Sequence, residues 1–207
     1  MLTNIITQLF GALTSASLLF LVAAGLTLIF GAMQIINIAH GSFYMFGAFI
    51  VASLAGTGAA STGVGFWVAV ILGPIVVGVI GALTEILILR RLYGKEHLLQ
   101  LLATFGLLYF FEGAALSIWG SEFRSVSIPT LLQGHLSGAA RSVPAYDLFI
   151  LGVAVAVGVF MWWLLQRTQL GWRIRAAVED PEMLAASGTN VSRLFTGVFA
   201  LGALLAG

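Results

Sequence analysis

Four side chains with hydrogen-bonding chemistry lie in a region of the chain that is otherwise apolar. Gln34, Asn37, His40 and Tyr44 follow one another at intervals of three and four residues. No Asp, Glu, Lys or Arg occurs between Met1 and Thr84. Polar groups are costly at membrane depth, so they usually line the interior of a helix bundle or a water-filled path. Carboxamide, imidazole and phenol groups can each exchange hydrogen bonds with a small polar solute.

The same groups can also hold a helix bundle together. If the segment is one helix, one face carries Gln34, Asn37, Gly41 and Tyr44, and His40 lies beside that face. These side chains would then line a path for a polar solute. Alternatively, they would bond to neighbouring helices, since interhelical polar contacts are common and contribute about 0.6–2 kcal/mol each. The residues alone leave both interpretations open.

The composition indicates a protein that crosses a membrane several times. The chain is 60% hydrophobic and 8% charged, whereas soluble domains have about 25% charged residues. A span needs about 20 apolar residues, and five runs reach about that length: Leu9–Phe30, Ile35–Leu54, Val64–Leu89, Leu98–Trp119 and Leu148–Leu165. A sixth run begins near Leu194 and stops at Gly207 inside apolar sequence. We therefore expect an all-α polytopic transmembrane bundle of about six spans, with the last one truncated.

The basic residues predict how the bundle is oriented. Seven of the nine lie in two connections, Arg90–His97 and Gln166–Arg193, and only two lie in Gly120–Asp147. The positive-inside rule places the first two connections in the cytoplasm and the third, with His135, outside. Counting spans backwards places the amino terminus outside. If Ile35–Ser42 is broken or re-entrant, an amino terminus on the inside is the alternative.

Two acidic residues occur in or beside the predicted spans. Glu112 lies about two turns before Trp119 and is the one acid well inside a span. It either touches a substrate or proton path, or it pairs near the outer surface or with a neighbouring helix. Glu85 and Arg90 flank one end of the third span, and their separation of five residues does not require a direct pair.

The stretch from Gly25 to Ala48, GLTLIFGAMQIINIAHGSFYMFGA, resembles the amino-terminal signature of bacterial branched-chain amino acid ABC transporter permeases of the LivH type. The likeness continues in TFGLLYFFEGAALSIWG (Thr104–Gly120) and in GWRIRAAVEDPEMLAASGTNVSRLF (Gly171–Phe195). It covers essentially the whole chain, and the family continues beyond this length. The resemblance implies a single transmembrane permease domain over residues 1–207, as an amino-terminal fragment of such a permease.

The resemblance also implies a function and a set of partners. The chain would be the permease subunit of an ATP-driven importer for branched-chain or related neutral amino acids in a bacterial inner membrane. Its partners would be a second permease subunit, two ATPase subunits and a periplasmic substrate-binding protein. Permeases for urea or short amides are similar and remain an alternative. A self-contained secondary carrier or channel, with Glu112 and His40 as a proton relay, is the alternative of another class.

The segment 166–193 contains local signals for a short capped helix. Asp180 is suited to an N-cap, Pro181 to the first helical position and Gly188 to a left-handed end. A helix over Pro181–Ser187 is therefore expected, and on the residues alone it is an ordinary surface helix or a docking element. The resemblance makes it the coupling loop that contacts the ATPase, with implied residues Arg175, Asp180, Pro181, Glu182, Met183, Leu184 and Gly188.

No catalytic or nucleotide-binding motif accompanies this loop. The Walker A motif needs a glycine-rich loop ending in Lys, and the one lysine, Lys95, is not in such a loop. HExxH and GxSxG are absent, and there is no cysteine. The histidines do not suggest a metal site, since His97 and His135 are predicted on opposite sides of the membrane. We expect no enzyme activity, no cofactor in this chain, ATP used by partner subunits, and no nucleic-acid binding.

Overall fold

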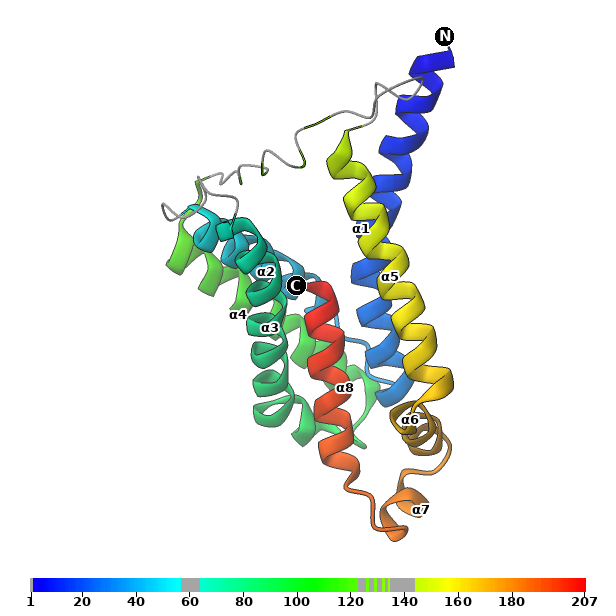
Figure 1. The fold of residues 1–207 in the computed structure, drawn as a ribbon. Helices are drawn as coiled ribbons and strands as arrows, with labels where there is room; N and C mark the ends of the chain where they lie inside the picture. The colour runs from blue at the N-terminus through cyan, green and yellow to red at the C-terminus, as the bar shows by residue number, and fades with distance from the viewer. Residues whose placement is uncertain are drawn as a thin grey trace.

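A computed structural model describes residues 2–56, 64–122, 126, 129, 132, 134 and 144–207. Within these residues the fold is all-α, as the sequence predicts (Figure 1). The elements in chain order are α1 (Leu2–Met33), α2 (His40–Gly56), α3 (Val64–Leu87), the 3-10 helix η2 (Leu89–Leu92), α4 (His97–Trp119), α5 (Ala145–Arg167), α6 (Gln169–Glu179), α7 (Pro181–Ala186) and α8 (Val191–Ala206).

Four of these helices are long and apolar enough to cross a membrane, namely α1, α3, α4 and α5. They correspond to the first, third, fourth and fifth predicted runs. The second run is helical only from His40, so α2 has 17 residues. The sixth begins at Val191 rather than Leu194, because the Asn190 side chain accepts a hydrogen bond from the Arg193 N–H at 3.0 Å and caps α8.

Helix α8 lies between α3 and α1 and packs closely against both (Figure 1). Glycines make this close packing possible, since small residues let helix backbones approach one another. A Cβ atom built on Gly25 of α1 would lie 2.3 Å from the carbonyl oxygen of Gly202 on α8. One built on Gly81 of α3 would lie 2.4 Å from Cβ of Ala203. Helix α8 is therefore in direct contact with two spans, through its backbone at Gly202 and through the small Ala203 side chain.

Helix α6 was not predicted, because the sequence analysis treated its residues only as part of a polar connection. Its three buried residues, Gly171, Ile174 and Ala177, recur every three positions, which is a helical spacing. Gly171 allows α6 to fold back on α5, since a Cβ there would lie 2.1 Å from the Leu165 carbonyl oxygen. The hydrophobic spacing was the available signal, and the surrounding arginines and glutamine obscured it.

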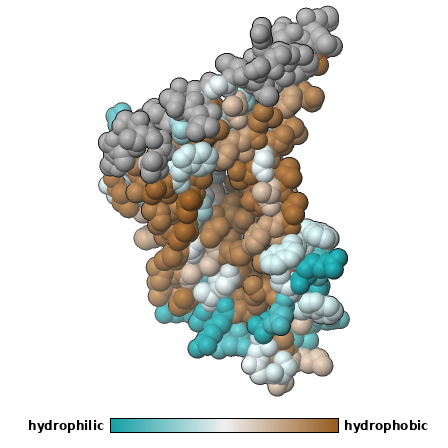
Figure 2. All heavy atoms as spheres, in the orientation of Figure 1, coloured by the Kyte–Doolittle hydropathy of each residue, from teal (hydrophilic) through white to brown (hydrophobic). Residues whose placement is uncertain are grey.

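The hydrophilic residues gather at the end of the bundle that carries α6 and α7, and apolar residues cover most of the visible face of its body (Figure 2). Both basic connections lie at this end, since Arg90 Nη2 donates to Thr196 Oγ1 of α8 at 2.6 Å. Helix α1 begins at the opposite end (Figure 1). The two basic connections thus lie at the same end of the bundle, as the positive-inside rule predicts. That this end faces the cytoplasm stays a prediction. Arg124, His135 and Arg141 lie outside the described residues.

Candidate functional site

The helix expected through the polar stripe is interrupted. Helix α1 ends at Met33, and Gln34 adopts a left-handed conformation with φ 52° while its N–H still donates to the Phe30 carbonyl oxygen at 2.8 Å. Residues 34–39 are not helical, and α2 starts at His40. The prediction that Gln34 and Asn37 share a helical face with Gly41 and Tyr44 is therefore wrong. The isoleucines at 35, 36 and 38 were a weak signal, since β-branched residues disfavour helices.

The polar residues instead occupy different environments along the chain. Gln34 is exposed and lines a cavity of about 350 Å³ together with Tyr93 and Pro181, at the end of the bundle that carries α7. Tyr44 is 47% exposed and lines a cavity of about 420 Å³ with Glu122, beyond the opposite end of α4. Gly41 is exposed, and a Cβ atom built on it would meet no described atom within 4 Å.

Asn37 and His40 lie between these positions and are buried, with exposures of 3% and 2%. The backbone N–H of His40 donates to the Asn37 carbonyl oxygen at 3.2 Å, which holds the two residues together. The Thr104 hydroxyl of α4 donates to the Ile36 carbonyl oxygen at 3.2 Å and ties the non-helical segment to α4. These two hydrogen bonds attach the non-helical segment to the start of α2 and to α4.

The buried pair has hydrogen-bonding capacity that the described residues do not use. His40 Nε2 lies 3.1 Å from the Val22 carbonyl oxygen. A carbonyl only accepts, so Nε2 carries a proton, and in the neutral imidazole Nδ1 is then an acceptor. Nδ1 of His40 and both amide atoms of Asn37 have no partner among the described residues. Since buried polar groups are nearly always hydrogen-bonded, this pair is suited to a small solute that offers both a donor and an acceptor.

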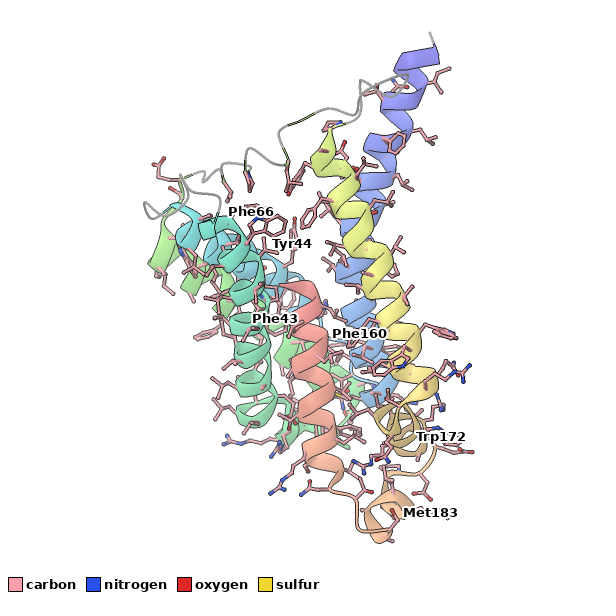
Figure 3. The ribbon with its side chains drawn as sticks, in the orientation of Figure 1. Phe43, Tyr44, Phe66, Phe160, Trp172 and Met183 are labelled. Atoms are coloured by element: carbon pink, nitrogen blue, oxygen red, sulfur yellow. The ribbon has the colours of Figure 1, made fainter. Side chains whose placement is uncertain are left out.

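Apolar packing closes the space around the pair. The ring of Phe43 lies 5.9 Å from the His40 ring, edge to face, and 5.9 Å from the ring of Phe199 on α8. Figure 3 shows Phe43 in the middle of the bundle and Tyr44 nearer the end where α3 begins. Gly25 leaves room for the imidazole, because a Cβ there would lie 3.1 Å from His40 Nε2. Access to Asn37 and His40 therefore requires movement of the surrounding helices.

Helix α7 forms as the cap signals predict, one residue shorter at its end. Asp180 Oδ1 accepts hydrogen bonds from the N–H groups of Glu182 and Met183 at 3.0 and 2.9 Å. Gly188 has φ 87°, the left-handed conformation expected after the helix. Met183 is 73% exposed at the tip of the molecule (Figure 3), whereas Leu184 is half-buried against an apolar cluster of α1, α5, α6 and α8. Of the two apolar residues, Met183 is the one free to contact another protein.

Arg175 lies apart from this tip. It belongs to α6, where its guanidinium donates to the Leu165 carbonyl oxygen and lies 5.1 Å from the ring of Trp172. These contacts hold α6 against the end of α5. The structure thus groups Asp180, Pro181, Glu182, Met183, Leu184 and Gly188 on or beside α7 and places Arg175 at a different contact.

A buried polar network that the sequence analysis did not identify joins α3, η2 and α8. Glu85 is fully buried and accepts hydrogen bonds from Arg90 Nε and Nη2 at 3.2 Å each, from the Tyr93 hydroxyl, and from Thr196 Oγ1 at 2.7 Å. Glu85 and Arg90 do pair directly, because the chain leaves the α-helix at Leu87 and turns back through η2. Burial, followed by the hydrogen bond to Glu85, raises the pKa of Tyr93, so its hydroxyl stays protonated and donates.

Glu112 is exposed on α4, and no hydrogen bond or ion pair from the described residues reaches it. The inward side of the same helix carries Thr104 and Phe111, which contact residue Ile36 and the ring of Phe43. No described contact joins Glu112 to His40, so the structure does not bring the two proposed members of a proton relay together. Within the described residues, no group of three or more His, Cys, Asp or Glu side chains is placed to hold a metal ion.

Comparisons with known proteins show similarity to one family of transport proteins. The model of a family described as "Branched-chain amino acid transport system / permease component" matches residues 8–207. The chain is 30% identical over 210 residues to the high-affinity branched-chain amino acid transport system permease protein BraD of Pseudomonas aeruginosa, covering 96% of this chain and 67% of BraD. It is 28% identical over 209 residues to the corresponding permease protein LivH of Escherichia coli K12, with the same coverage. No solved structure matches the chain significantly.

Proposed function

The chain belongs to the family of branched-chain amino acid transport permease components, and we propose that it is the permease subunit of an ATP-driven importer that moves a small neutral amino acid past Asn37 and His40. A permease subunit of this family is a multi-pass membrane protein and is not itself a catalyst. The transport function is supported by the family match, which extends over almost the whole chain. The buried, unpartnered Asn37 and His40 support the position of the substrate path.

The chemistry of the pair suits a branched-chain amino acid. A zwitterion offers an ammonium donor and a carboxylate acceptor, which match the Asn37 oxygen or His40 Nδ1 and the Asn37 amide N–H, respectively. The aromatic ring of Phe43 next to His40 offers an apolar surface for an aliphatic side chain. A neutral amide such as urea fits the same polar groups, so the substrate class is decided by experiment.

The positions of Gln34 and Tyr44 support alternating access. Gln34 lines a cavity at the α7 end, Tyr44 lines a cavity at the other end, and Asn37 and His40 are buried between them along the chain. In the proposed cycle, a substrate enters from the Tyr44 side, is held by the buried pair, and leaves on the Gln34 side. Gly41 is exposed beside Tyr44, which keeps that face of α2 open.

Helix α7 is proposed to dock on one of two separate ATPase subunits. It is short, capped at both ends and presents Met183 outward. It also lies near the cavity that Gln34 lines, since Pro181 lines the same cavity. A second permease subunit, a periplasmic binding protein that delivers the substrate and a bacterial inner membrane complete the proposal.

The path is tested by replacing the buried pair in the whole complex. Asn37→Leu and His40→Leu are expected to reduce leucine uptake into proteoliposomes at least tenfold while the complex assembles normally. Gln34→Leu, at the exposed end of the proposed path, removes a polar group that is not buried and should have a smaller effect. Normal uptake by an assembled Asn37→Leu complex would exclude the path, and uptake of urea but not leucine by the wild type would change the substrate class.

Docking is tested with Met183→Glu, because a charge buried at an interface is strongly unfavourable. The variant should insert normally and lose both co-purification with the ATPase and substrate-stimulated ATP hydrolysis. Met183→Leu, which keeps an apolar side chain of similar volume at the same position, is the control. Leu184 is unsuitable for this test because it packs against the body of the protein. If Met183→Glu still co-purifies with the ATPase and keeps substrate-stimulated ATP hydrolysis, α7 is an ordinary surface helix. Substrate uptake without any ATPase would favour a secondary carrier.

A further inference from the structure

Within the described residues, the buried side-chain atoms that lack a hydrogen-bond partner belong to three residues. They are the two amide atoms of Asn37, Nδ1 of His40 and Oε1 of Gln100. Asn37 and His40 belong to the proposed path, whereas Gln100, on α4, has no role in it. Its exposure is 6%. Because buried polar atoms are nearly always hydrogen-bonded, a donor from outside these residues is expected at the Gln100 oxygen.

The orientation of the Gln100 carboxamide is determined by its nitrogen. Nε2 donates to the Leu92 carbonyl oxygen at 3.1 Å and to the Lys95 carbonyl oxygen at 3.2 Å. Carbonyl oxygens only accept, so the nitrogen faces them and Oε1 lies on the other side of the carboxamide. Oε1 is therefore an acceptor without a partner, and a ligand that meets it must offer a donor.

Gln100 lines the cavity of about 350 Å³ that Gln34 and Pro181 also line. Small-molecule sites have volumes of about 300–1,000 Å³ and are mostly apolar, with a few polar groups that orient the ligand. Most of the remaining lining is apolar and comes from α1, α6, α8 and the non-helical segment, for example Val178 and Ile35. No described Asp, Glu, Lys or Arg lines this cavity. The cavity is therefore suited to a small ligand without net charge.

The cavity and the buried pair share the non-helical segment. Thr104 lies one helical turn after Gln100 on the same face of α4, and its hydroxyl donates to the Ile36 carbonyl oxygen. Ile35 lines the cavity, and Asn37 is buried two residues later. Along this segment, the unused hydrogen-bonding atoms thus extend from the buried pair toward the end of the bundle that carries α7.

We propose that this cavity is a second substrate site, on the α7 side, in which Gln100 Oε1 accepts a hydrogen bond from the ammonium group of the amino acid before it is released. The inference rests on the proposed function, because it adds a step to the same path. The apolar lining suits an aliphatic side chain, and the exposed Gln34 carboxamide has N–H donors for the carboxylate. Gln100 has one unused atom where the buried pair has three, so the substrate is held less strongly here, as a release site requires.

The site is tested by protection of single cysteines in the assembled complex, because the chain has no cysteine of its own. Met33→Cys places a thiol in the cavity wall. Ala176→Cys, at an exposed position of α6 that does not line the cavity, is the control. Millimolar leucine should slow the reaction of Met33→Cys with a maleimide severalfold and leave the reaction of Ala176→Cys unchanged.

Two results of this assay would overturn the proposal. Equal reaction rates of Met33→Cys with and without leucine would mean that the cavity holds only water. No reaction of Met33→Cys, while Ala176→Cys reacts, would mean that protein fills the cavity in the complex. Leucine uptake by the wild-type complex is measured in parallel. Uptake without protection refutes this site alone, whereas protection without uptake refutes the transport function.

The hydrogen bond is tested by adding Gln100→Met, which removes the acceptor and nearly keeps the length of the side chain. The leucine concentration for half-maximal protection of Met33→Cys should rise about tenfold, or about 1.4 kcal/mol, which is near the contribution of one hydrogen bond to a charged group. Isocaproate has the carbon skeleton of leucine without the ammonium group. It should protect equally with and without Gln100→Met.

This comparison separates a direct contact from a general effect on the fold. Weaker protection by both compounds in Gln100→Met would mean that the residue only shapes the cavity, and would refute the hydrogen bond. If the Gln100→Met complex does not assemble, the two compounds are compared in Met33→Cys alone. Leucine should then protect at lower concentration than isocaproate, and equal protection would contradict the contact with the ammonium group.

Discussion

Replacing Gly25 by Ala tests whether the contact between α1 and α8 controls both the fold and the buried pair. The added Cβ would lie 2.3 Å from the Gly202 carbonyl oxygen, whereas ordinary contacts begin near 3.4 Å. The nearest atom belongs to the backbone of α8, so it cannot rotate away as a side chain can. The two helices must separate by about 1 Å, and overpacking of this kind costs about 1–3 kcal/mol.

Gly31 on the same helix provides the control. A Cβ there would meet no described atom within 4 Å, so Gly31→Ala receives only the better helix propensity of alanine, about 1 kcal/mol. The two variants add the same atom to the same helix and differ only in what it meets. At about 2–4 °C per kcal/mol for a chain of this size, Gly25→Ala should unfold about 2–12 °C below Gly31→Ala.

The assay is thermal unfolding of both variants in detergent, followed by leucine uptake of the assembled complex. Uptake should fall in Gly25→Ala, because the same Cβ would lie 3.1 Å from His40 Nε2 and displace the imidazole. Gly31→Ala should transport normally. Equal unfolding temperatures would refute the close contact of α1 and α8. If Gly25→Ala is much less stable but transports normally, the contact of α1 with α8 stabilises the fold without affecting the proposed path.

Three further predictions concern other regions. Thr196→Val should lower stability by about 1.5–3 kcal/mol, measured by thermal unfolding, because the buried Glu85 carboxyl group loses one of its hydrogen-bond donors. Gln34→Gly should be at least as stable as wild type and Gln34→Val less stable, since a left-handed φ of 52° favours glycine and disfavours β-branched residues. Single cysteines at Gly94 and Gly134 should react with an impermeant reagent from opposite sides of the membrane, and labelling of both from one side would contradict the predicted topology.

The elements that the sequence predicted well are those whose signals are local. Helix α7 is an example, because Asp180 and Pro181 define its start and Gly188 defines its end within nine residues. The long spans were predicted by their apolar runs for the same reason. A break within Ile35–Ser42 was left open as an alternative, and the structure has that break. Its start at Gln34 was not predicted, since a left-handed turn is normally marked by Gly or Asn. Here a glutamine occupies it, and a long-range bond from Thr104 to the Ile36 carbonyl oxygen helps to hold the extended segment.

The environments of the polar residues depend on contacts between distant parts of the chain. The spacing of Gln34, Asn37 and Tyr44 suggested one shared face, but burial separates Asn37 from the other two. The Glu85 network could not be predicted from spacing, because one of its donors, Thr196, lies 111 residues away. Composition identified which residues are unusual at membrane depth. Packing decided which of them are buried together.

The position of α8 gives the proposed transport cycle a physical connection between its two ends. Helix α7 leads through Gly188 and the Asn190 cap directly into α8, so the proposed docking site and α8 are joined by only a few residues. Farther along α8, Gly202 contacts Gly25, whose Cβ position lies beside the His40 imidazole. A shift of α8 that followed movement of α7 would therefore change the space at His40, because the intervening contacts are backbone to backbone and leave little room for compensation. A bulkier residue at Gly202 should for this reason impair coupling between ATP hydrolysis and uptake even where α7 still docks.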